Sequence, residues 1–582
     1  MVVAEAVPAE PSPRAASDRG ATEPLDLPPV ERAQRALDRF NAGCRDEALA
    51  LALSLLEHPA LGAEMAHLAA ACQHQQGRSA EAVPLLMRAI RLDPANASYL
   101  NTFGVILRKL KRTQQAVRCY QRALVLQPLF PDCHYNCGNA LQDLDSTAEA
   151  CHHYDLCIQQ NPQHYSAHHN WANILRDDHA LDQALAHYSR SAELHWDNPD
   201  MHCNWGLTWQ LKEEWGKAID CFQTCINLKA DHAPAHINLG SALAVQERFE
   251  ESCEILRRGV ELDDSCHDAK FNLGLTLLTI GELKEGFGFY ETRLSLPDKV
   301  KPPYTTPPWD GDLGIDGPLM VWSEQGYGDN IQFARYLPIL VEAGLQVTYA
   351  TRKPLVPLFR ECLAPHSPAI VEQKRENLEG YHHHIAVMSL PKVLGTRLET
   401  IPMMPGYLKA PDPIPERLRI HRRPFALHVG LVWASGADNK DMYAHKSMAL
   451  EPLMALFDRW RQDRLVVIHS LQVGVDAEQL EPWRGQRGVV DHAQDLHDFL
   501  DTACVLSQLD LVVTVDTAVA HVAGGLGRPT WCLLQHNADW RWLRGRADSP
   551  WYPSMSLFRQ RRLGDWPSVV EQMGARLGQL LG

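Results

Sequence analysis

The sequence of 582 residues contains no run of 18 apolar residues, and we therefore predict that no helix spans a membrane. It also lacks an excess of positive charge, because 56 Lys and Arg stand against 71 Asp and Glu, giving a formal net charge of −15. A surface that neutralises phosphates is not expected, which argues against nucleic acid and anionic membranes as partners. Apolar residues make up 45% and charged residues 22% of the chain, a balance that excludes a wholly disordered or fibrous protein.

The amino-terminal segment lacks the basic and apolar stretches of a signal peptide. Residues 1–28 are instead rich in Ala, Pro and Glu, and we predict a disordered leader. The 15 cysteines lack Cys or His partners at the spacing of a zinc site. Eleven of them lie between Cys72 and Cys266, many within helical patterns, and we interpret them as small packing residues in a reducing compartment. We expect a cytoplasmic protein without a metal site.

The first half of the chain contains a repeat of 34 residues. A small residue recurs at this interval, at Gly104, Gly138, Ala172, Gly206, Gly240 and Gly274. A second small residue follows each by 12 positions, at Ala116, Ala150, Ala184, Ala218, Ser252 and Gly286. A large side chain follows four positions later, at Tyr120, Tyr154, Tyr188, Phe222, Leu256 and Tyr290. We therefore predict that each unit forms two short helices, which approach each other at their small residues, with the large side chain packing between neighbouring helices.

This pattern resembles the tetratricopeptide repeat. The grid extends backwards through Ala70 with Ala82 and Ala36 with Ala48, which gives about eight units over residues 29–300. The resemblance implies an α-solenoid, a superhelix whose long concave surface normally binds another polypeptide. We therefore expect a protein or peptide as a partner of this half.

A column of asparagines follows the same repeat, two positions before each small residue, at Asn136, Asn170, Asn204, Asn238 and Asn272. An asparagine carries both a donor and an acceptor, so the column either pairs with an extended peptide backbone or ties adjacent repeats together. It resembles the column of the O-linked N-acetylglucosamine transferase superhelix, where asparagines line the groove and hold substrate protein. The resemblance implies that these five residues bind an acceptor.

A column of histidines runs parallel to the asparagines, at His134, His168, His202 and His236. Successive members stand one full repeat apart, too far to share a metal ion. We interpret them as polar groove-lining or inter-repeat residues rather than as a metal-binding stripe.

The second half begins with a linker, residues 301–317, which is rich in Pro and Gly. Beyond it, strands are predicted over 319–323, 346–350 and 384–387, and helices over 330–343 and after Pro391. Pro338 predicts a kink or an early end in the first of these helices. The alternation of strand, helix and strand indicates a parallel sheet, and we assign residues 318–425 to a first lobe.

A second lobe is predicted over residues 426–582. Its strands are expected over 428–434, 464–469, 509–515 and 530–534, and its helices over 450–461, 496–508 and 518–526. Two Rossmann-like lobes suit an enzyme whose ligands bind in a cleft, at the carboxyl ends of the strands.

Asp329 is the first candidate for chemistry, since it ends a turn with two glycines, Gly326 and Gly328, between a predicted strand and helix. A carboxylate that faces the cleft there could remove a proton from an attacking hydroxyl. It could equally cap the helix that follows. The residues alone leave both interpretations open.

The second candidate is the start of the helix at Asp516 and Thr517, with His521 on the same helix face. Free N–H groups and the positive end of the helix dipole suit a phosphate there. Alternatively, Asp516 and Thr517 cap the helix and His521 belongs to the core. Lys446 follows the strand 428–434 at the same edge of the sheet, where it either neutralises a diphosphate or is a solvated loop residue.

Three motifs carry a second resemblance. Residues 324–338 (EQGYGDNIQFARYLP) and 514–529 (TVDTAVAHVAGGLGRP) are similar to bacterial glycosyltransferases of the lipopolysaccharide heptosyltransferase type, which have the GT-B fold. Together with 539–552 (DWRWLRGRADSPWY), the region 305–582 resembles a bacterial group in which such a domain follows tetratricopeptide repeats. The resemblance implies that Asp329 is the catalytic aspartate. It implies donor-binding roles for Gly326, Gly328, Lys446, Asp516, Thr517 and His521.

The sequence departs from the heptosyltransferase motif at Ala518, where that family has Gly, and in the loop lengths around Lys446. The donor is therefore left open, and ADP-heptose is not carried over. An aromatic group formed by Trp540, Trp542, Trp551 and Tyr552 is either a wall for a sugar or part of an interdomain core.

From these features we expect an inverting glycosyltransferase that moves a sugar from a nucleotide-sugar to a hydroxyl of a protein held by the repeats. No obligatory metal and no cofactor besides the donor substrate are expected. One alternative is a transferase that acts on a glycan or lipid acceptor. Another is a non-catalytic adaptor whose second half has kept the GT-B fold without its activity.

Overall fold

A computed structural model describes residues 27–296, 305–324, 326–363, 368–374, 380–403, 406–436, 440–463 and 465–581. Nearly all of the predicted leader and the start of the predicted linker lie outside these ranges. The chain forms two compact units, Met1–Ala235 and His236–Gly582, which are considered separately. Among the helices described, none is both long enough and apolar enough to cross a bilayer.

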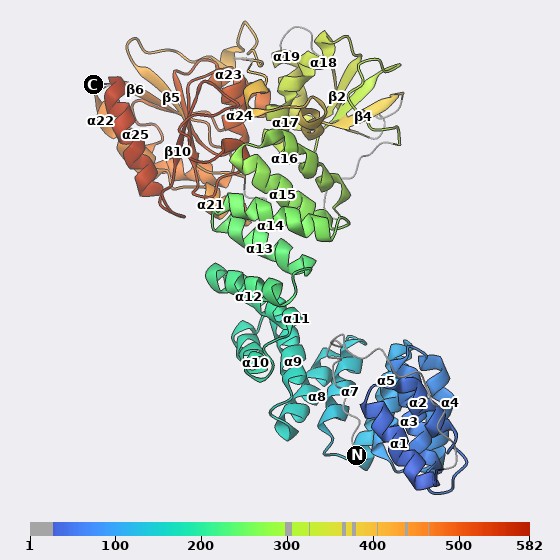
Figure 1. Ribbon diagram of the computed structural model, residues 1–582. Helices are drawn as coiled ribbons and strands as arrows, with labels where there is room; N and C mark the ends of the chain where they lie inside the picture. Colours follow the sequence, from blue (N-terminus) through green and yellow to red (C-terminus); the bar gives the residue numbers. More distant parts are fainter. Residues whose placement is uncertain are drawn as a thin grey trace. The chain divides into compact units, whose positions relative to one another are not determined.

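The first unit is built from helices that pack in consecutive pairs (Figure 1). They are α1 (Pro29–Asn41), α2 (Arg45–Leu53), α3 (Gly62–Gln75), α4 (Ser79–Leu92), α5 (Ala97–Lys109), α6 (Thr113–Leu126), α7 (Pro131–Gln142), α8 (Thr147–Gln160), α9 (Tyr165–Asp177), α10 (Leu181–Leu194), α11 (Pro199–Leu211) and α12 (Trp215–Leu228). The second unit opens with α13 (Ala233–Val245), α14 (Phe249–Leu262), α15 (His267–Ile280) and α16 (Leu283–Tyr290). A helical solenoid therefore occupies roughly the first 290 residues, as predicted.

The turn inside each helix pair holds one residue in the left-handed conformation. These residues recur every 34 positions, at Gly43, Gly77, Lys111, Asp145, His179, Glu213, Glu247 and Gly281. Glycine adopts this conformation freely, whereas for other residues it costs roughly 1 kcal/mol of conformational free energy. The turns give the period of the solenoid independently of the small residues on its helices.

The glycines of the repeat leave space for the large side chains that recur 16 positions later in the sequence. A Cβ atom on Gly104 would lie 2.4 Å from the ring of Tyr120, and one on Gly138 would lie 2.7 Å from the ring of Tyr154. In each case the ring closes the helix pair of its own repeat. The cysteines are all free thiols, and most of them are buried, in keeping with packing residues.

A region with two parallel sheets follows the solenoid. The first sheet contains β1 (Leu319–Trp322), β2 (Val347–Thr351), β3 (Ala369–Glu372) and β4 (His383–Ala386) in the order β3-β2-β1-β4. Its helices are α17 (Tyr327–Phe333), α18 (Leu337–Glu342), α19 (Val356–Cys362) and α20 (Leu390–Val393). The break predicted at Pro338 is confirmed, because a 3-10 turn separates α17 from α18 and Pro338 lies in the first turn of α18.

The second sheet contains β5 (Leu427–Val432), β6 (Val466–Ser470), β7 (Val489–Asp491), β8 (Leu511–Val515), β9 (Thr530–Leu534) and β10 (Met555–Arg559). Its helices are α21 (Lys440–Lys446), α22 (Glu451–Gln462), α23 (Phe499–Leu506), α24 (Ala518–Gly525) and α25 (Trp566–Leu581). The strand order is β10-β9-β8-β5-β6-β7, so the direction of winding reverses between β5 and β8. Ligands of such sheets bind in the crevice beyond the carboxyl ends of the strands at that point.

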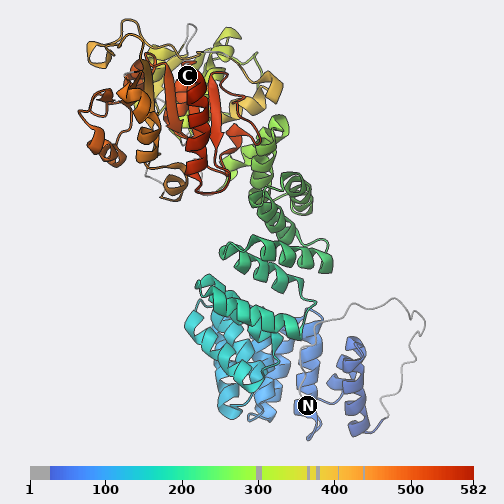
Figure 2. The same cartoon turned by 90° about the vertical axis from the view of Figure 1, so that its left-hand side faces the viewer.

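The two faces of the second sheet belong to different cores. Val513, Val515 and Leu533 face the core that includes α22 and α25, and Figure 2 shows α25 in red over this face. Alternate residues, such as Cys532 and Leu534, face a core that is shared with α24 and the first sheet. The second face is therefore the one turned toward the first lobe.

The turn conformation predicts a stability difference that can be measured in the first unit. Glu213 is exposed and has φ +60°, so Glu213→Gly should raise the free energy of unfolding by about 0.5–1 kcal/mol. Gly77 has φ +80° and open space around a Cβ atom, so Gly77→Ala should lower it by about 1 kcal/mol. Urea unfolding followed by circular dichroism tests both, and a stabilising Gly77→Ala would contradict the argument.

Candidate functional site

Two short helices, α17 and α24, pack against each other where the lobes meet (Figure 1). Gly328 lies in the first turn of α17 and faces His521 of α24. A Cβ atom on residue 328 would lie 2.7 Å from Cδ2 of His521, so glycine is needed for the helices to approach this closely. The two motifs that the sequence singled out, 324–329 and 514–529, are thus neighbours.

The carboxylate of Asp329 in α17 forms an ion pair across the lobes with Nη2 of Arg541. The N-cap of α17 is Gly326, with φ +87°, and among the described residues no side chain caps this helix. Asp329 lies inside the first turn, so its interpretation as the helix cap is wrong. Burial raises the pKa of Asp329 to about 6, against the opposing effect of Arg541 and with help from Asp539 and Glu324. Such a carboxylate is a stronger base than an ordinary aspartate and is still mostly ionised at neutral pH.

Arg541 is a residue of this site that the sequence analysis did not predict. Its Nε donates to Oε1 of Gln332 at 2.9 Å, and its Nη1 lies 2.8 Å from Oδ1 of Asp539. The side chain is 9% exposed, and although burial works against the charge, Asp539 and Asp329 raise the pKa of Arg541 further above its ordinary value. The only signal in the sequence was its place within the 539–552 motif.

Lys446 and Asp516 meet at the point where the second sheet reverses direction. Nζ of Lys446 lies 2.6 Å from Oδ2 of Asp516, and the two side chains are 12% and 6% exposed. Burial opposes both charges, but Lys446 and Arg541 hold the pKa of Asp516 below its usual value, and Asp516 raises that of Lys446. Lys446 is therefore not a solvated loop residue, and its charge is already matched.

Thr517 is the N-cap residue of α24, although its hydroxyl does not cap the helix. Its Oγ1 lies 3.2 Å from Oγ1 of Thr514, and no side-chain cap bond is found for α24 within the described chain. The first N–H groups of α24 therefore keep their capacity to bind an anion.

His521 is 3% exposed and has core contacts on the side away from Gly328. Its Nδ1 lies 2.9 Å from the hydroxyl of Tyr552, and its ring stacks on Trp542 at 5.4 Å between centroids. Burial lowers the pKa of His521 to about 3, so the ring is neutral. These contacts agree with the core interpretation of His521 at least as well as with donor binding.

The aromatic group is buried and does not form an open wall. Trp540, Trp542, Trp551 and Tyr552 are each at most 5% exposed. They belong to the core that joins the first lobe, the face of the second sheet turned toward it and the last repeat. Of the two interpretations left open by the sequence, the interdomain core is the one that the contacts support.

The last repeat contacts both sides of the site. Arg293, in the 3-10 turn after α16, binds Glu324 with Nε and Nη2 at 2.7 and 2.6 Å, and Nη2 also donates to Ser389 Oγ at 2.8 Å. Glu324 begins the loop that carries Asp329. Phe287 of α16 packs edge-on against Trp540, the neighbour of Arg541, at 5.6 Å between ring centroids. The end of the solenoid thus contacts the loop that precedes α17 and the turn that carries Arg541.

The predicted asparagine column ties neighbouring repeats together. Nδ2 of Asn136 donates to Oδ1 of Asn101 at 3.1 Å, and Nδ2 of Asn170 donates to Oδ1 of Asn139 at 2.7 Å. In the same column, Asn204 lies 3.3 Å from Nε2 of His169, Asn272 donates to Ser241 Oγ at 3.0 Å, and Asn238 is also engaged. Every member is partly exposed, so the amides also remain within reach of a ligand.

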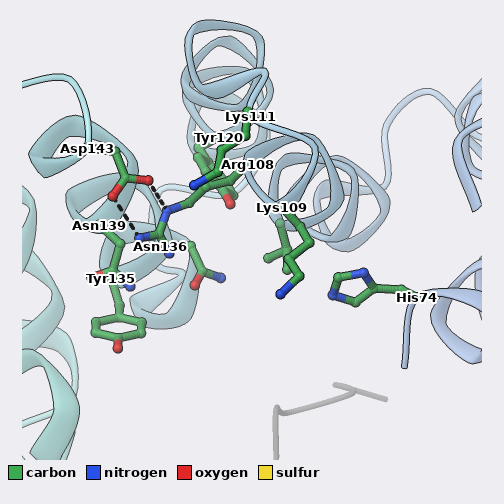
Figure 3. Close-up of a pocket in the computed structure, with 10 residues that line it drawn as sticks. His74, Arg108, Lys109, Lys111, Tyr120, Tyr135, Asn136, Asn139 and Asp143 are labelled. Carbon is green, nitrogen blue, oxygen red and sulfur yellow. Dashed lines mark hydrogen bonds and ion pairs between the residues drawn. The ribbon is translucent and has the colours of Figure 1, made fainter. Parts of the chain in front are cut away.

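A cavity of about 550 Å³ opens in the first unit beside Asn136 (Figure 3). Arg108 lines it and binds both carboxylate oxygens of Asp143, at 2.6 and 3.0 Å. Lys109 and His74 approach the same space from another side, as Figure 3 shows. The wall is therefore polar, with amide and cationic groups suited to a polypeptide backbone or an acidic side chain.

The histidine column has a structural role that the structure makes plain. Nε2 of His134 and of His168 each lies 3.3 Å from a proline carbonyl six residues earlier, and Nε2 of His202 lies 2.7 Å from the carbonyl of Trp196. Burial lowers the pKa of all three, so each neutral ring donates from Nε2 to the chain that joins two repeats.

Two Asp-x-Asp tripeptides, 143–145 and 310–312, could in principle hold a divalent cation. Asp143 is committed to Arg108, whereas Oδ1 of Asp310 and of Asp312 accept backbone N–H groups at 3.1 and 2.9 Å. Within the described ranges no three His, Cys, Asp or Glu side chains converge as metal ligands.

Comparison with known proteins identifies the repeats. A TPR repeat model matches residues 104–145 and a tetratricopeptide repeat model matches residues 63–96. The chain is 27% identical over 329 residues to Protein FlbA of Caulobacter vibrioides, a match that covers 52% of this chain and 53% of that protein. It thus spans about half the length of the curated relative that it matches.

Solved structures of repeat proteins are similar over the solenoid. YrrB, described as a TPR protein with an unusual peptide-binding site, is 19% identical, with 32% of this chain and 95% of that chain covered and a TM-score of 0.29. A tetratricopeptide repeat protein from Parabacteroides merdae is 15% identical, with 43% and 98% covered and a TM-score of 0.34.

The contact between Arg293 and Glu324 predicts a large effect on stability. Arg293→Met leaves a carboxylate buried without its partner and should cost the second unit about 3–5 kcal/mol. Arg258, whose pair with Glu261 is exposed, provides the control, and Arg258→Met should change stability by less than about 0.5 kcal/mol. Scanning calorimetry of the full chain measures both, and equal effects would contradict a special role for Arg293.

Proposed function

We propose that this chain is an inverting glycosyltransferase with a GT-B fold, which moves a sugar from a nucleotide-sugar to a hydroxyl of a protein bound by the repeats. The observation that carries the proposal is the packing of α17, which bears Asp329, against α24, next to the pair of Lys446 and Asp516 at the carboxyl end of β8. The resemblance to heptosyltransferase-type enzymes supports it, because the same three segments bear the motifs.

Asp329 is the proposed base. It removes the proton from the acceptor hydroxyl while that oxygen attacks the anomeric carbon, and the bond from this carbon to the donor phosphate breaks on the opposite face. The proton ends on Asp329 and the electron pair leaves with the phosphate. Its raised pKa favours proton uptake, and Arg541 keeps the carboxylate ionised before the reaction.

The departing phosphate needs stabilisation as its charge grows. The first N–H groups of α24 and the hydroxyl of Thr517 supply donors, and Lys446 supplies a cation at the same strand edge. Asp516 fixes the ammonium of Lys446 before the donor arrives, so little reorganisation is needed during the reaction.

The repeats provide the acceptor site in this proposal. Nδ2 of Asn136 donates to Asn101, and Nδ2 of Asn170 donates to Asn139 and Tyr135 of the neighbouring repeat. Both side chains are partly exposed, and the amide oxygen of each can accept from a peptide backbone. Such pairing reads the backbone rather than the side chains, which suits an enzyme that accepts more than one sequence. A glycan or lipid acceptor and a non-catalytic adaptor are outcomes that the experiments below distinguish.

Substitution of the base tests the mechanism. Asp329→Asn keeps the shape of the side chain and removes its basicity, so transfer should fall by about 10²–10⁴-fold while nucleotide-sugar binding persists. Transfer is read as the mass gained by an acceptor protein that the repeats retain from the source cell. Full activity of Asp329→Asn would show that the assigned base is wrong, and sugar found only on a glycan or lipid would favour the alternative acceptor.

The pH dependence of transfer provides an independent check. A base acts when deprotonated, so activity should be complete above the pKa of Asp329, about 6, and should fall as the pH drops through that value. The profile of kcat/KM from about pH 5 to about pH 8 should show this single acid limb. A rate independent of pH over the acidic side would contradict the assignment.

The groove is tested by changing its amides. The double variant Asn136→Ala and Asn170→Ala should raise KM for a protein acceptor by about tenfold, because each lost hydrogen bond is worth about 0.5–1.5 kcal/mol. The value of kcat should stay near that of the wild type, since neither residue takes part in the proposed chemical step. Gln159→Ala on an exposed helix position is the control and should change neither constant.

A further inference from the structure

Arg559 is a partly buried cation at the edge of the second sheet that no proposed step uses. It is the last residue of β10 and pairs in register with Leu534 of β9, while Leu533 pairs with Val515 of β8. The next level along β8 is Asp516, so Arg559 and Asp516 lie at the same height, two strands apart. That separation is about 10 Å between Cα atoms.

The alternation of the strand gives the side of the sheet that Arg559 takes. Phe558 faces the core formed with α22 and α25, and Leu557 faces the core shared with α24 and the first lobe. Arg559 therefore lies on the same side as Leu557, turned toward the first lobe. Lys446 and Asp516 meet at this edge as well. Burial raises the pKa of the Cys532 thiol, and the positive charges of Lys446 and Arg559 both oppose that rise.

The donors of Arg559 are incompletely used. Nη2 donates to the carbonyl of Leu543 at 2.7 Å, whereas Nη1 is buried and has no hydrogen-bond partner among the described residues. Leu543 itself has the left-handed φ of +47°, so the guanidinium holds a strained backbone carbonyl beside Arg541. A buried N–H donor of a charged group that lacks an acceptor costs folding free energy, and a bound ligand can supply that acceptor.

Charge compensation sets Arg559 apart from its neighbours. Four other cations of this region form ion pairs with carboxylates. The pairs are Lys446 with Asp516, Arg541 with Asp329 and Asp539, Arg293 with Glu324, and Arg544 with Glu247. Arg335 lies between aromatic rings, 4.6 Å from that of Tyr552. In the described part of the chain, no carboxylate oxygen comes within 4.0 Å of Arg559. Burial and the nearby charge of Arg544 lower the pKa of Arg559 to about 10, which an anion would reverse.

We infer that Arg559 binds a phosphate group of the donor, on the far side of the strand edge from Lys446. The inference rests on the proposed function for the identity of the ligand. The charge of Lys446 is shared with Asp516, so Arg559 adds a positive charge that has no carboxylate partner of its own for a diphosphate with more than one negative charge. A cation here both binds the donor and stabilises the phosphate as it leaves.

Inorganic pyrophosphate is the probe for this site, titrated into the full chain by calorimetry. Pyrophosphate should bind the wild type, and Arg559→Gln should weaken it by at least about tenfold, as expected for a charge-assisted bond. Arg561→Gln is the matched control, since Arg561 stands two positions further on and is 68% exposed, and it should bind as the wild type does. Arg559→Lys keeps the charge and should retain more affinity than Arg559→Gln.

Equal binding by the wild type and Arg559→Gln would overturn the inference, and so would absence of pyrophosphate binding by the wild type. If Arg559→Gln does not fold, phenylglyoxal labelling of the wild type replaces it. Pyrophosphate should then protect Arg559 and leave Arg561 reactive, and equal labelling of Arg559 with and without pyrophosphate overturns the inference. The proposed function fails separately, if pyrophosphate binds through Arg559 but no nucleotide-sugar does.

Discussion

The site depends on the ion pair between Asp329 and Arg541, which joins the two lobes. Asp329 stands at the start of a helix in the first lobe, and Arg541 reaches it from a 3-10 turn 212 residues later in the chain. Without the guanidinium, burial would favour the protonated carboxyl, and without the carboxylate, Arg541 would lose one of its two ion-pair partners and keep the other, Asp539. The pair therefore influences the charge of the proposed base and links α17 of the first lobe to the 3-10 turn that carries Arg541.

The last repeat is part of this arrangement. Arg293 holds Glu324 at the head of the loop that carries Asp329, and Phe287 supports Trp540 next to Arg541. Both ends of the central ion pair thus rest on one helix and the turn after it. A solenoid that merely carried the second region on a linker would not need a buried arginine at its last turn. The last helix of the repeats and the turn after it therefore pack against the candidate site.

Much of the architecture could be predicted from the sequence, because it depends on patterns that repeat. The 34-residue grid fixes the solenoid, and apolar runs between helical stretches fix most of the strands. The short edge strands β3 and β7 have little pattern, and β10 mixes Ser556 and Arg559 with apolar residues, so they went unpredicted. The break at Pro338 followed from its missing N–H and fixed φ.

Reasoning about the site from the sequence succeeded where the order of the strands decides which residues meet. It did not find contacts made by side chains from other segments. Lys446 and Asp516 were expected at one strand edge, and the topology brings them together. His521 was interpreted either as a donor-binding or as a core residue, and its contacts with Tyr552 and Trp542 agree with the core interpretation. Arg541 belongs to no local pattern of its own.

The account as a whole is tested most directly by a thermal-shift screen of the full chain against a panel of nucleotides and nucleotide-sugars. It predicts that one nucleotide class, with its sugar conjugate, raises the melting temperature, and no shift with any member of the panel would contradict it.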